Sequence, residues 1–170
     1  LRTSLNRINA NSLKYEWYVK NMITDRETLE TLRSLHMKRM KSKNYNKSTL
    51  YKSIISYIKL KLLLYKEKNN NIVEASMQNM ENSFAAIVKL QDEIVGYIYG
   101  LREKRGVIRI LQNCVNEDYK FYSPMFRGIY DYISDNCGNC DINDIDFTRG
   151  DEEYKYKLGG KEVKLYNFVI

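Results

Sequence analysis

The chain has 170 residues, of which 44% are hydrophobic and 29% are charged, values typical of a single soluble globular domain. Because no run of 18 apolar residues occurs, the sequence excludes a long apolar membrane-spanning helix. The net charge of +7 is uneven: residues 1–70 hold 16 Lys and Arg against 5 Asp and Glu, and residues 71–170 hold 12 against 16.

The chain begins with a predicted helix and a predicted strand. Leu1, Leu5 and Ile8 recur at helical spacing. Residues 1–10 are therefore expected to form a helix, followed by one domain over residues 11–170. Residues 13–19 alternate between apolar and polar side chains, which predicts a strand with one buried face.

Two helices are expected after this strand. Thr24 and Glu27 have the spacing of a capping box, in which each side chain satisfies the other's free backbone N–H. A helix is therefore predicted over residues 25–41, with its inward face formed by Leu29, Leu32, Leu35 and in part His36. A second helix is predicted over residues 49–66, and residues 72–82 favour neither helix nor loop.

From residue 84 the period of the apolar residues changes from 3.6 to 2. Three short strands are predicted at Phe84–Leu90, Ile94–Leu101 and Val107–Val115. Only short polar links separate them, and such links force neighbouring strands to run antiparallel. This segment therefore predicts a three-stranded meander.

A helix and two more strands complete the order. Ser123 and Pro124 combine an N-cap residue with a first-turn proline. The helix that they start is expected to bury the stripe Phe126, Ile129, Tyr130 and Ile133. Strands are predicted at Asp144–Thr148 and Val163–Val169, with a short helix between them. The whole predicts an α+β fold in three layers, a mixed central sheet with an antiparallel meander flanked by helices.

The most informative segment is Asp146–Lys155. It is expected to hold the end of a buried strand, a glycine turn and a dense cluster of charged side chains. Binding crevices in α/β proteins form at the carboxyl ends of strands. The segment is therefore the candidate functional site.

In order and motifs the chain resembles the Gcn5-related N-acetyltransferase (GNAT) fold. More closely it resembles the C-terminal module of CelD-like (cellulose-biosynthesis-type) acetyltransferases of bacteria, which are related to Fem-type peptidyltransferases. The similar segments are Leu1–Arg7, Leu35–Met40, Tyr122–Met125 and, above all, Asp146–Lys155. Met40 stands where the family has tryptophan, and the glycine after the Ser-Pro pair is replaced by Met125.

This resemblance implies an acyltransferase, the second half of a two-module enzyme, in which residues 1–10 are the linker helix from a missing N-terminal module. It would transfer an acyl or aminoacyl group from acetyl-CoA, another acyl-CoA or an aminoacyl-tRNA to an amine acceptor. In the related fold the carrier lies between two splayed strands, here Val107–Val115 and Asp144–Thr148. Its phosphates rest on the loop before the central helix, here residues 116–123. That loop has no glycine and two carboxylates, so conventional coenzyme A binding is expected to be hindered.

Lys155 is the first candidate catalytic residue. The resemblance implies that its ammonium group holds the donor's anionic or developing oxyanion group, a role that suits a compact cation. The local spacing instead favours an ion pair with Asp151 or Glu152, which lie four and three residues earlier. Both interpretations remain open at the level of the sequence.

Asp146 and Tyr154 are the other candidate catalytic residues. Asp146 is expected either to orient Lys155 or Arg149, or to accept a proton from the amine, or else to form the turn before the glycine. Tyr154 is either a proton donor to the leaving group or a packing residue.

Three residues are candidates for holding the acyl carrier. Arg149 is an anion clamp or a solvated turn residue, Gly150 supplies a positive φ angle, and Ser123 ends the predicted phosphate loop. His36, the one histidine of the chain, is either a partly buried helix residue or lies near the acceptor.

The cysteines favour a reducing, cytoplasmic location and free thiols. Cys114, Cys137 and Cys140 are odd in number, and no secretory signal accompanies them. The Cys137-x-x-Cys140 spacing suits a zinc ligand pair or a simple turn, but a structural zinc needs four ligands and a second pair is missing. No metal is therefore predicted.

Two other functions compete with acyl transfer. The basic residues 1–70 favour a non-catalytic module that binds RNA or another anionic partner, or else two helices with solvated lysine faces. The glycine-free phosphate loop is also compatible with a degenerate fold that serves as a dimerisation scaffold.

Overall fold

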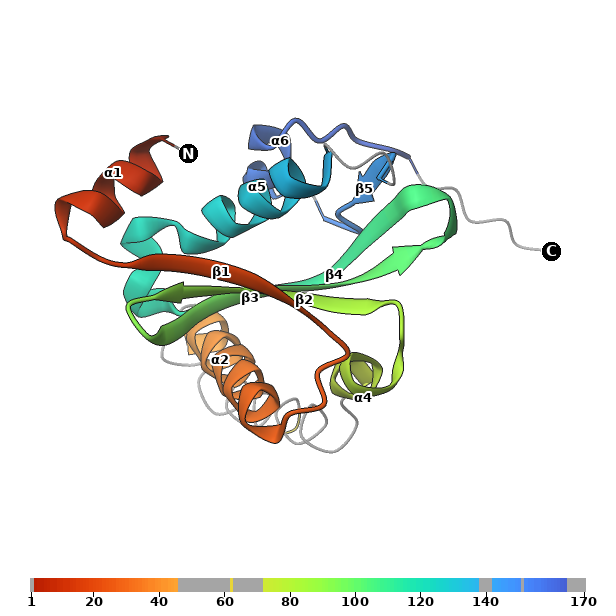
Figure 1. Cartoon of the computed structure of the whole chain (residues 1–170), viewed down its shortest axis with the longest axis horizontal. Helices are drawn as coiled ribbons and strands as arrows, with labels where there is room; N and C mark the ends of the chain where they lie inside the picture. Colours follow the sequence, from red (N-terminus) through yellow and green to blue (C-terminus); the bar gives the residue numbers. More distant parts are fainter. Residues whose placement is uncertain (1, 46–61, 63–71, 138–141, 151, 165–170) are drawn as a thin grey trace, which may run out of the picture.

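The computed structural model describes residues 2–45, 62, 72–137, 142–150 and 152–164. A five-stranded sheet lies between helices on both of its faces (Figure 1). The strands are Tyr15–Asn21 (β1), Ser83–Leu90 (β2), Glu93–Glu103 (β3), Val107–Val115 (β4) and Asp144–Asp146 (β5). The α-helices are Arg2–Ala10 (α1), Arg26–Tyr45 (α2), Ile72–Asn79 (α4), Pro124–Cys137 (α5) and Glu153–Lys157 (α6), and two short 3₁₀ helices are Lys104–Gly106 (η1) and Glu117–Tyr122 (η2).

The sheet is mixed, as predicted, and its strands lie in chain order from β1 to β5. Strands β1 to β4 are antiparallel neighbours, which confirms the meander. Strand β5 joins β4 in parallel, with Val107 opposite Asp144 and Arg109 opposite Asp146. A parallel pair needs a long crossover, and η2 and α5 supply it.

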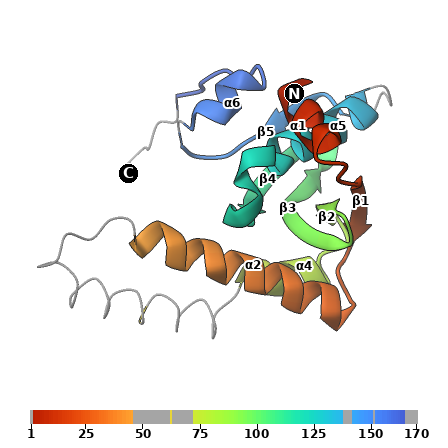
Figure 2. The same ribbon diagram turned by 90° about the vertical axis from the view of Figure 1, so that its left-hand side faces the viewer.

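The core has one apolar layer on each face of the sheet. Helices α2 and α4 cover one face, and α1, α5 and α6 lie on the other (Figures 1 and 2). Strand β2 is buried on both faces, with Ala85 and Ile87 in the α2 layer and Phe84 and Ala86 in the α5 layer. Burial of apolar side chains on both faces stabilises the sheet and holds the helices against it.

The start of α2 corrects one prediction. Asp25, not Thr24, caps the helix: its Oδ1 accepts a hydrogen bond of 2.9 Å from the backbone N–H of Thr28. Its Oδ2 also pairs with Lys20 of β1 at 2.6 Å. A carboxylate at a helix N-terminus interacts favourably with the helix dipole, and the lysine favours Asp25 further. The inward positions Leu29, Leu32 and Leu35 are buried as expected.

Other expected elements differ in extent. Helix α4 forms where the sequence favoured neither state, and the helix predicted over residues 49–66 lies outside the described residues except for residue 62. Strand β5 ends at Asp146 rather than at Thr148. The strand predicted over residues 163–169 lies mostly outside the described part, and residues 163 and 164 within it are not in a strand. In the described part no helix is long and apolar enough to cross a membrane.

The buried face of α5 also differs from the expected stripe. Met125, Ile129 and Tyr132 are buried, whereas Tyr130 is 39% exposed. Gly128 explains the rotation, because a Cβ built there would lie 2.4 Å from Cγ2 of Val88 on β2. The helix turns its smallest residue to the sheet at the point of closest approach.

A β-bulge in β4 shapes the site. Opposite β3, Gln112 pairs with Tyr99 and Ile110 pairs with Gly100, so Leu111 is an extra residue without a partner. A bulge bends its strand and increases the local twist. In this chain the bend begins one residue after Arg109, the last residue of β4 that pairs with β5.

Candidate active site where β4 and β5 part

The two parallel strands diverge immediately after they meet. Strand β5 pairs with β4 only over Val107–Arg109, and then the β4 bulge turns the strand away. From Ile110 to Val115 this edge of β4 has no strand partner in the described part of the chain. The parting lies at the carboxyl ends of a parallel pair, where α/β proteins form binding crevices.

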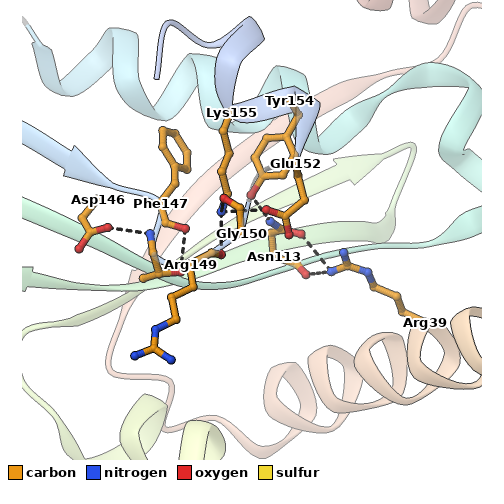
Figure 3. Close-up of polar contacts among 10 residues, drawn as sticks. Arg39, Asn113, Asp146, Phe147, Arg149, Gly150, Glu152, Tyr154 and Lys155 are labelled. Carbon is orange, nitrogen blue, oxygen red and sulfur yellow. Dashed lines mark hydrogen bonds and ion pairs between the residues drawn. The ribbon is translucent and has the colours of Figure 1, made fainter. Parts of the chain in front are cut away.

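A cleft of about 200 Å³ occupies this gap. Helix α2 contributes to it from one face of the sheet, and α6 with the loop before it contributes from the other (Figure 3). The lining consists of Arg39, Ile110, Leu111, Gln112, Asn113, Phe147, Thr148, Arg149, Glu152, Tyr154 and Lys155. The structure therefore brings three of the six predicted site residues, Arg149, Tyr154 and Lys155, into one cleft.

Lys155 is a buried cation whose side chain is only 10% exposed. Its Nζ lies 2.8 Å from Oε2 of Glu152 and donates to the carbonyl oxygens of Arg149 and Gly150 at 2.9 and 3.2 Å (Figure 3). An ammonium group has three N–H donors, so these contacts use all of them. The ion pair with Glu152 that the spacing favoured is present, and Asp151 lies outside the described residues.

Tyr154 presents a hydroxyl group to the cleft. Its oxygen accepts a hydrogen bond of 2.8 Å from Nδ2 of Asn113, and its ring packs edge-on against Phe147. Burial raises the pKa of Tyr154, the carboxylate of Glu152 raises it further, and Asn113 and Arg39 oppose the change. The hydroxyl is therefore protonated at neutral pH, and because it accepts from Asn113 its own proton is available to a ligand.

Arg39 and Asn113 are site residues that the sequence reasoning missed. Nη1 of Arg39 donates both to the backbone oxygen and to Oδ1 of Asn113, the latter at 3.0 Å. Next to them, Gln112 contacts Nδ1 of His36, which is half-buried. The adjacent polar pair Gln112-Asn113, in a strand whose other residues are apolar except for Arg109, was the available signal. It places amide groups at the unpaired edge of β4.

Asp146 lies beside the cleft and not within its lining. Its Oδ1 accepts a hydrogen bond of 2.7 Å from the backbone N–H of Thr148, and its Oδ2 lies 3.2 Å from Nε of Arg109. These contacts form the turn that the sequence offered as the simpler alternative. The expectation that Asp146 orients Lys155 or Arg149 is wrong, because its contacts are with Thr148 and Arg109.

The three candidate carrier-binding residues have different surroundings. Gly150 has a φ angle of 108°, which confirms the predicted left-handed position. Arg149 is exposed, and its side chain extends away from Lys155 (Figure 3). Ser123 does not line the cleft; it precedes α5 with a φ angle of 49°, and its N–H donates to the carbonyl oxygen of Lys120.

In the loop before α5, backbone N–H groups donate hydrogen bonds to other residues of the same loop. The N–H of Asp118 donates to the side chain of Asn116, and the N–H of Tyr119 donates to the carbonyl oxygen of the same residue. Helix α1 also packs on this loop, where Arg7 donates to the carbonyl oxygen of Phe121 at 2.7 Å. These contacts use the backbone N–H groups of Asp118 and Tyr119, and the expectation that coenzyme A binding is hindered at this loop stays a prediction.

The candidate metal ligands and the cysteines can be followed only in the described residues. Among them, no group of three or more His, Cys, Asp and Glu side chains is placed to hold a metal ion. Cys114 is buried and forms no disulfide within the described residues. Cys140 lies outside the described residues, so the structure does not describe the Cys137–Cys140 spacing.

Comparison with known proteins agrees with this geometry. Residues 66–156 match the family described as "Acetyltransferase (GNAT) domain". Similar solved structures include an aminoglycoside acetyltransferase from an uncultured soil metagenomic sample (14% identity, TM-score 0.57, covering 92% of this chain and 98% of the other). A possible acetyltransferase from Clostridium difficile 630 is similar at 13% identity and a TM-score of 0.55, covering 92% and 97% of the two chains.

A ribosomal-protein-alanine N-acetyltransferase from Brucella melitensis is similar at 8% identity and a TM-score of 0.54, covering 92% and 98%. No curated protein matches the sequence. At these identities the solved structures support the fold alone, whereas the family match covers more than half of the chain. The chain therefore belongs to the GNAT acetyltransferase family.

Proposed function

We propose that this chain transfers an acyl group from acyl-CoA to an amine, with the cleft between β4 and β5 as the site of transfer. One observation carries the proposal: two parallel strands part at a bulge, and a protonated tyrosine hydroxyl lies in the gap. The family provides the reaction class, and the cleft provides the place.

The residues present fit the acyl end of such a donor. Beyond Arg109 the edge of β4 has no strand partner among the described residues, and its backbone groups, apart from the Asn113 oxygen that accepts from Arg39, can bind an extended arm in the manner of an added strand. The thioester of the donor would supply the activated acyl group. A cleft of about 200 Å³ suits the acyl end and the adjoining arm rather than a whole nucleotide carrier. Gly150 and Ser123 are proposed only as flanks of the carrier path.

The proposed roles follow from the contacts. Tyr154 donates its proton to the leaving sulfur, because its raised pKa keeps that proton in place. Lys155 positions the turn before α6, because its three donors are engaged there. Asp146 holds the end of β5 through Arg109.

A second donor class, aminoacyl-tRNA, belongs with the finer resemblance to CelD-like and Fem-type enzymes. The 16 Lys and Arg against 5 acidic residues in residues 1–70 favour it, as does the loop before α5, whose donors are used internally. The same charge favours RNA binding without catalysis. Under either alternative a second module would accompany this one.

The variant Tyr154→Phe tests the proposal. The experiment follows release of free thiol from acetyl-CoA with a panel of primary amines. Loss of a general acid should lower kcat about 100-fold or more while KM for acetyl-CoA changes little. The matched control is Tyr156→Phe, because Tyr156 is on the same helix and 48% exposed. A Tyr154→Phe enzyme with the wild-type kcat would remove Tyr154 from the reaction.

A further inference from the structure

The described lining of the cleft has more positively charged side chains than negatively charged ones. Lys155 and Glu152 pair with each other, and the nearby Asp146 pairs with Arg109. This leaves Arg39 and Arg149, to which no carboxylate is paired in the part of the chain that the structure describes. Just outside the lining, Arg109 also pairs with Glu103. The described lining itself holds three cations, Arg39, Arg149 and Lys155, against the one carboxylate of Glu152, an excess of two positive charges.

The guanidinium group of Arg39 is positioned by hydrogen bonds to Asn113. Asn113 accepts twice from its Nη1, which fixes the plane of the guanidinium group at the edge of β4. Arginine has five N–H donors, and among the described residues only those on Nη1 of Arg39 have an acceptor, so the opposite edge of this guanidinium can donate to a ligand. Arg39 further lies close enough to Tyr154 for its charge to act on the hydroxyl.

Arg149 provides a second cation on the loop before α6. Its backbone is anchored, because its carbonyl oxygen accepts from Lys155 at 2.9 Å, whereas its side chain is exposed and extends away from that turn (Figure 3). The two arginines thus come from helix α2 on one face of the sheet and from the loop after β5, and both line the same cleft.

We propose that Arg39 and Arg149 form an anion-binding site in the cleft, which holds a phosphate or carboxylate group of a ligand. A guanidinium group matches the two oxygens of either group with parallel hydrogen bonds. The site would replace the loop before α5, whose backbone donors are used internally. The choice of ligand rests on the proposed function, and the presence of the site does not.

The anionic group can belong to the donor or to the acceptor. If it belongs to the donor, the arginines bind a phosphate of coenzyme A, and the thioester, which lies a pantetheine arm away, is then outside this cleft and out of reach of Tyr154. If it belongs to the acceptor, the substrate is an amine that also carries a carboxylate or phosphate, and polycationic amines would be repelled. Both are the same chemistry at the same two side chains, and the experiment separates them.

The principal variant is Arg149→Gln, because the Arg149 side chain is exposed and, within the described part of the chain, only the backbone oxygen of this residue accepts a hydrogen bond. The control is Arg2→Gln, an exposed arginine at the start of α1 outside the cleft lining. Each protein is titrated with inorganic pyrophosphate, acetyl-CoA and S-acetylpantetheine, the last a thioester without nucleotide phosphates. Turnover is measured with a neutral amine and with amino acids.

We expect Arg149→Gln to weaken pyrophosphate binding about 10-fold, in line with a lost charge-assisted hydrogen bond. A donor site weakens acetyl-CoA binding equally and leaves S-acetylpantetheine unchanged. An acceptor site leaves acetyl-CoA unchanged and raises KM for amino acids but not for the neutral amine. Arg39→Gln should act in the same direction, with its melting temperature as a check on folding.

The proposal is overturned if Arg149→Gln and Arg2→Gln bind all three ligands like the wild type and their KM values agree. It is equally overturned if the wild type binds no pyrophosphate and acts on anionic and neutral amines alike. Failure of the proposed function has a different signature, because a wild type that binds pyrophosphate but never releases thiol retains the anion site and lacks the transferase reaction.

Discussion

At the scale of single residues, Lys155 is the most constrained side chain of the site. An ammonium group that is only 10% exposed is costly unless all its donors are satisfied. Here a carboxylate and two carbonyl oxygens of the same short segment satisfy them. The side chain therefore ties Arg149, Gly150 and Glu152 to α6 in one wall of the cleft.

The variant Lys155→Met should lower both stability and turnover. It removes three hydrogen bonds of a charged donor, and we expect a loss of about 1–3 kcal/mol in the free energy of unfolding. Urea unfolding and thiol release measure the two effects. Lys157→Met is the control, because its pair with Glu153 is exposed and should contribute little. Equal unfolding of Lys155→Met and wild type would show that the turn holds without the lysine.

At the scale of elements, the β4 bulge separates the paired part of the sheet from the open part. Gly100 lies opposite it, and a Cβ built there would be 2.6 Å from the backbone oxygen of Arg109 and 2.8 Å from Cε1 of Phe84. A backbone atom inside a sheet cannot move aside cheaply. The close approach of β3 and β4 thus depends on a missing side chain.

Gly100→Ala should therefore strain the strand pair at the edge of the cleft. Overpacking of this kind costs about 1–3 kcal/mol, and we expect thiol release to fall because Arg109 holds Asp146 at the end of β5. Leu111→Ala, in the same bulge but 41% exposed, should cost less stability. Thermal unfolding of both variants compares them. A Gly100→Ala protein as stable as the wild type would contradict the packing argument.

The cap of α2 predicts a dependence of stability on pH. Hydrogen bonds with Lys20 and then Thr28 lower the pKa of Asp25 from 3.8 to about 2. A carboxyl group with a lowered pKa stabilises the fold above its unfolded value, and this contribution is lost as pH falls from about 4 to 2. Asp25→Ala should cost about 0.5–2 kcal/mol at pH 7.

Urea unfolding at pH 7 and pH 2.5 measures this difference, which should shrink at the lower pH. Asp92→Ala, in the exposed turn between β2 and β3, is the control at both pH values. A cost of Asp25→Ala that stayed constant with pH would mean that the ionised carboxylate does not stabilise the helix start.

At the scale of the whole molecule, the sequence predicted the sheet better than it predicted the site. Strands β2 to β4 were predictable because their apolar period and short links leave few other arrangements. Lys155, Tyr154 and Arg149 were predictable because they lie within seven residues of one another. The contact between Arg39 and Asn113 spans 74 residues of sequence, and only the packing of α2 on β4 creates it.

Tertiary contacts also explain the errors. Thr24 and Asp25 are equally good caps locally, and the lysine of β1 favours the second. The buried face of α5 is set by the fit of Gly128 against Val88, which no periodicity contains. One alternative for Asp146 was to orient Lys155 or Arg149 from the end of the strand, yet Arg109 on β4 pairs with its carboxylate.

A ligand that binds only the folded chain should stabilise all of it. At 100 times its dissociation constant, acetyl-CoA would add about 2.7 kcal/mol, or about 5–10 °C in melting temperature. Differential scanning fluorimetry with acetyl-CoA and with tRNA, each at 50 and 300 mM salt, separates the two donor classes. Stabilisation by tRNA alone, lost at the higher salt, would favour the RNA-binding alternative over acyl-CoA.

The cleft receives side chains from helices on both faces of the sheet. The gap between β4 and β5 is thus lined from both faces of the sheet, so two reactants can approach it from opposite sides. An enzyme with such a site can bind both substrates at once, so the first product need not leave before the second substrate binds. In double-reciprocal plots, the initial-rate lines for this chain should therefore intersect, which indicates a ternary complex, instead of running parallel.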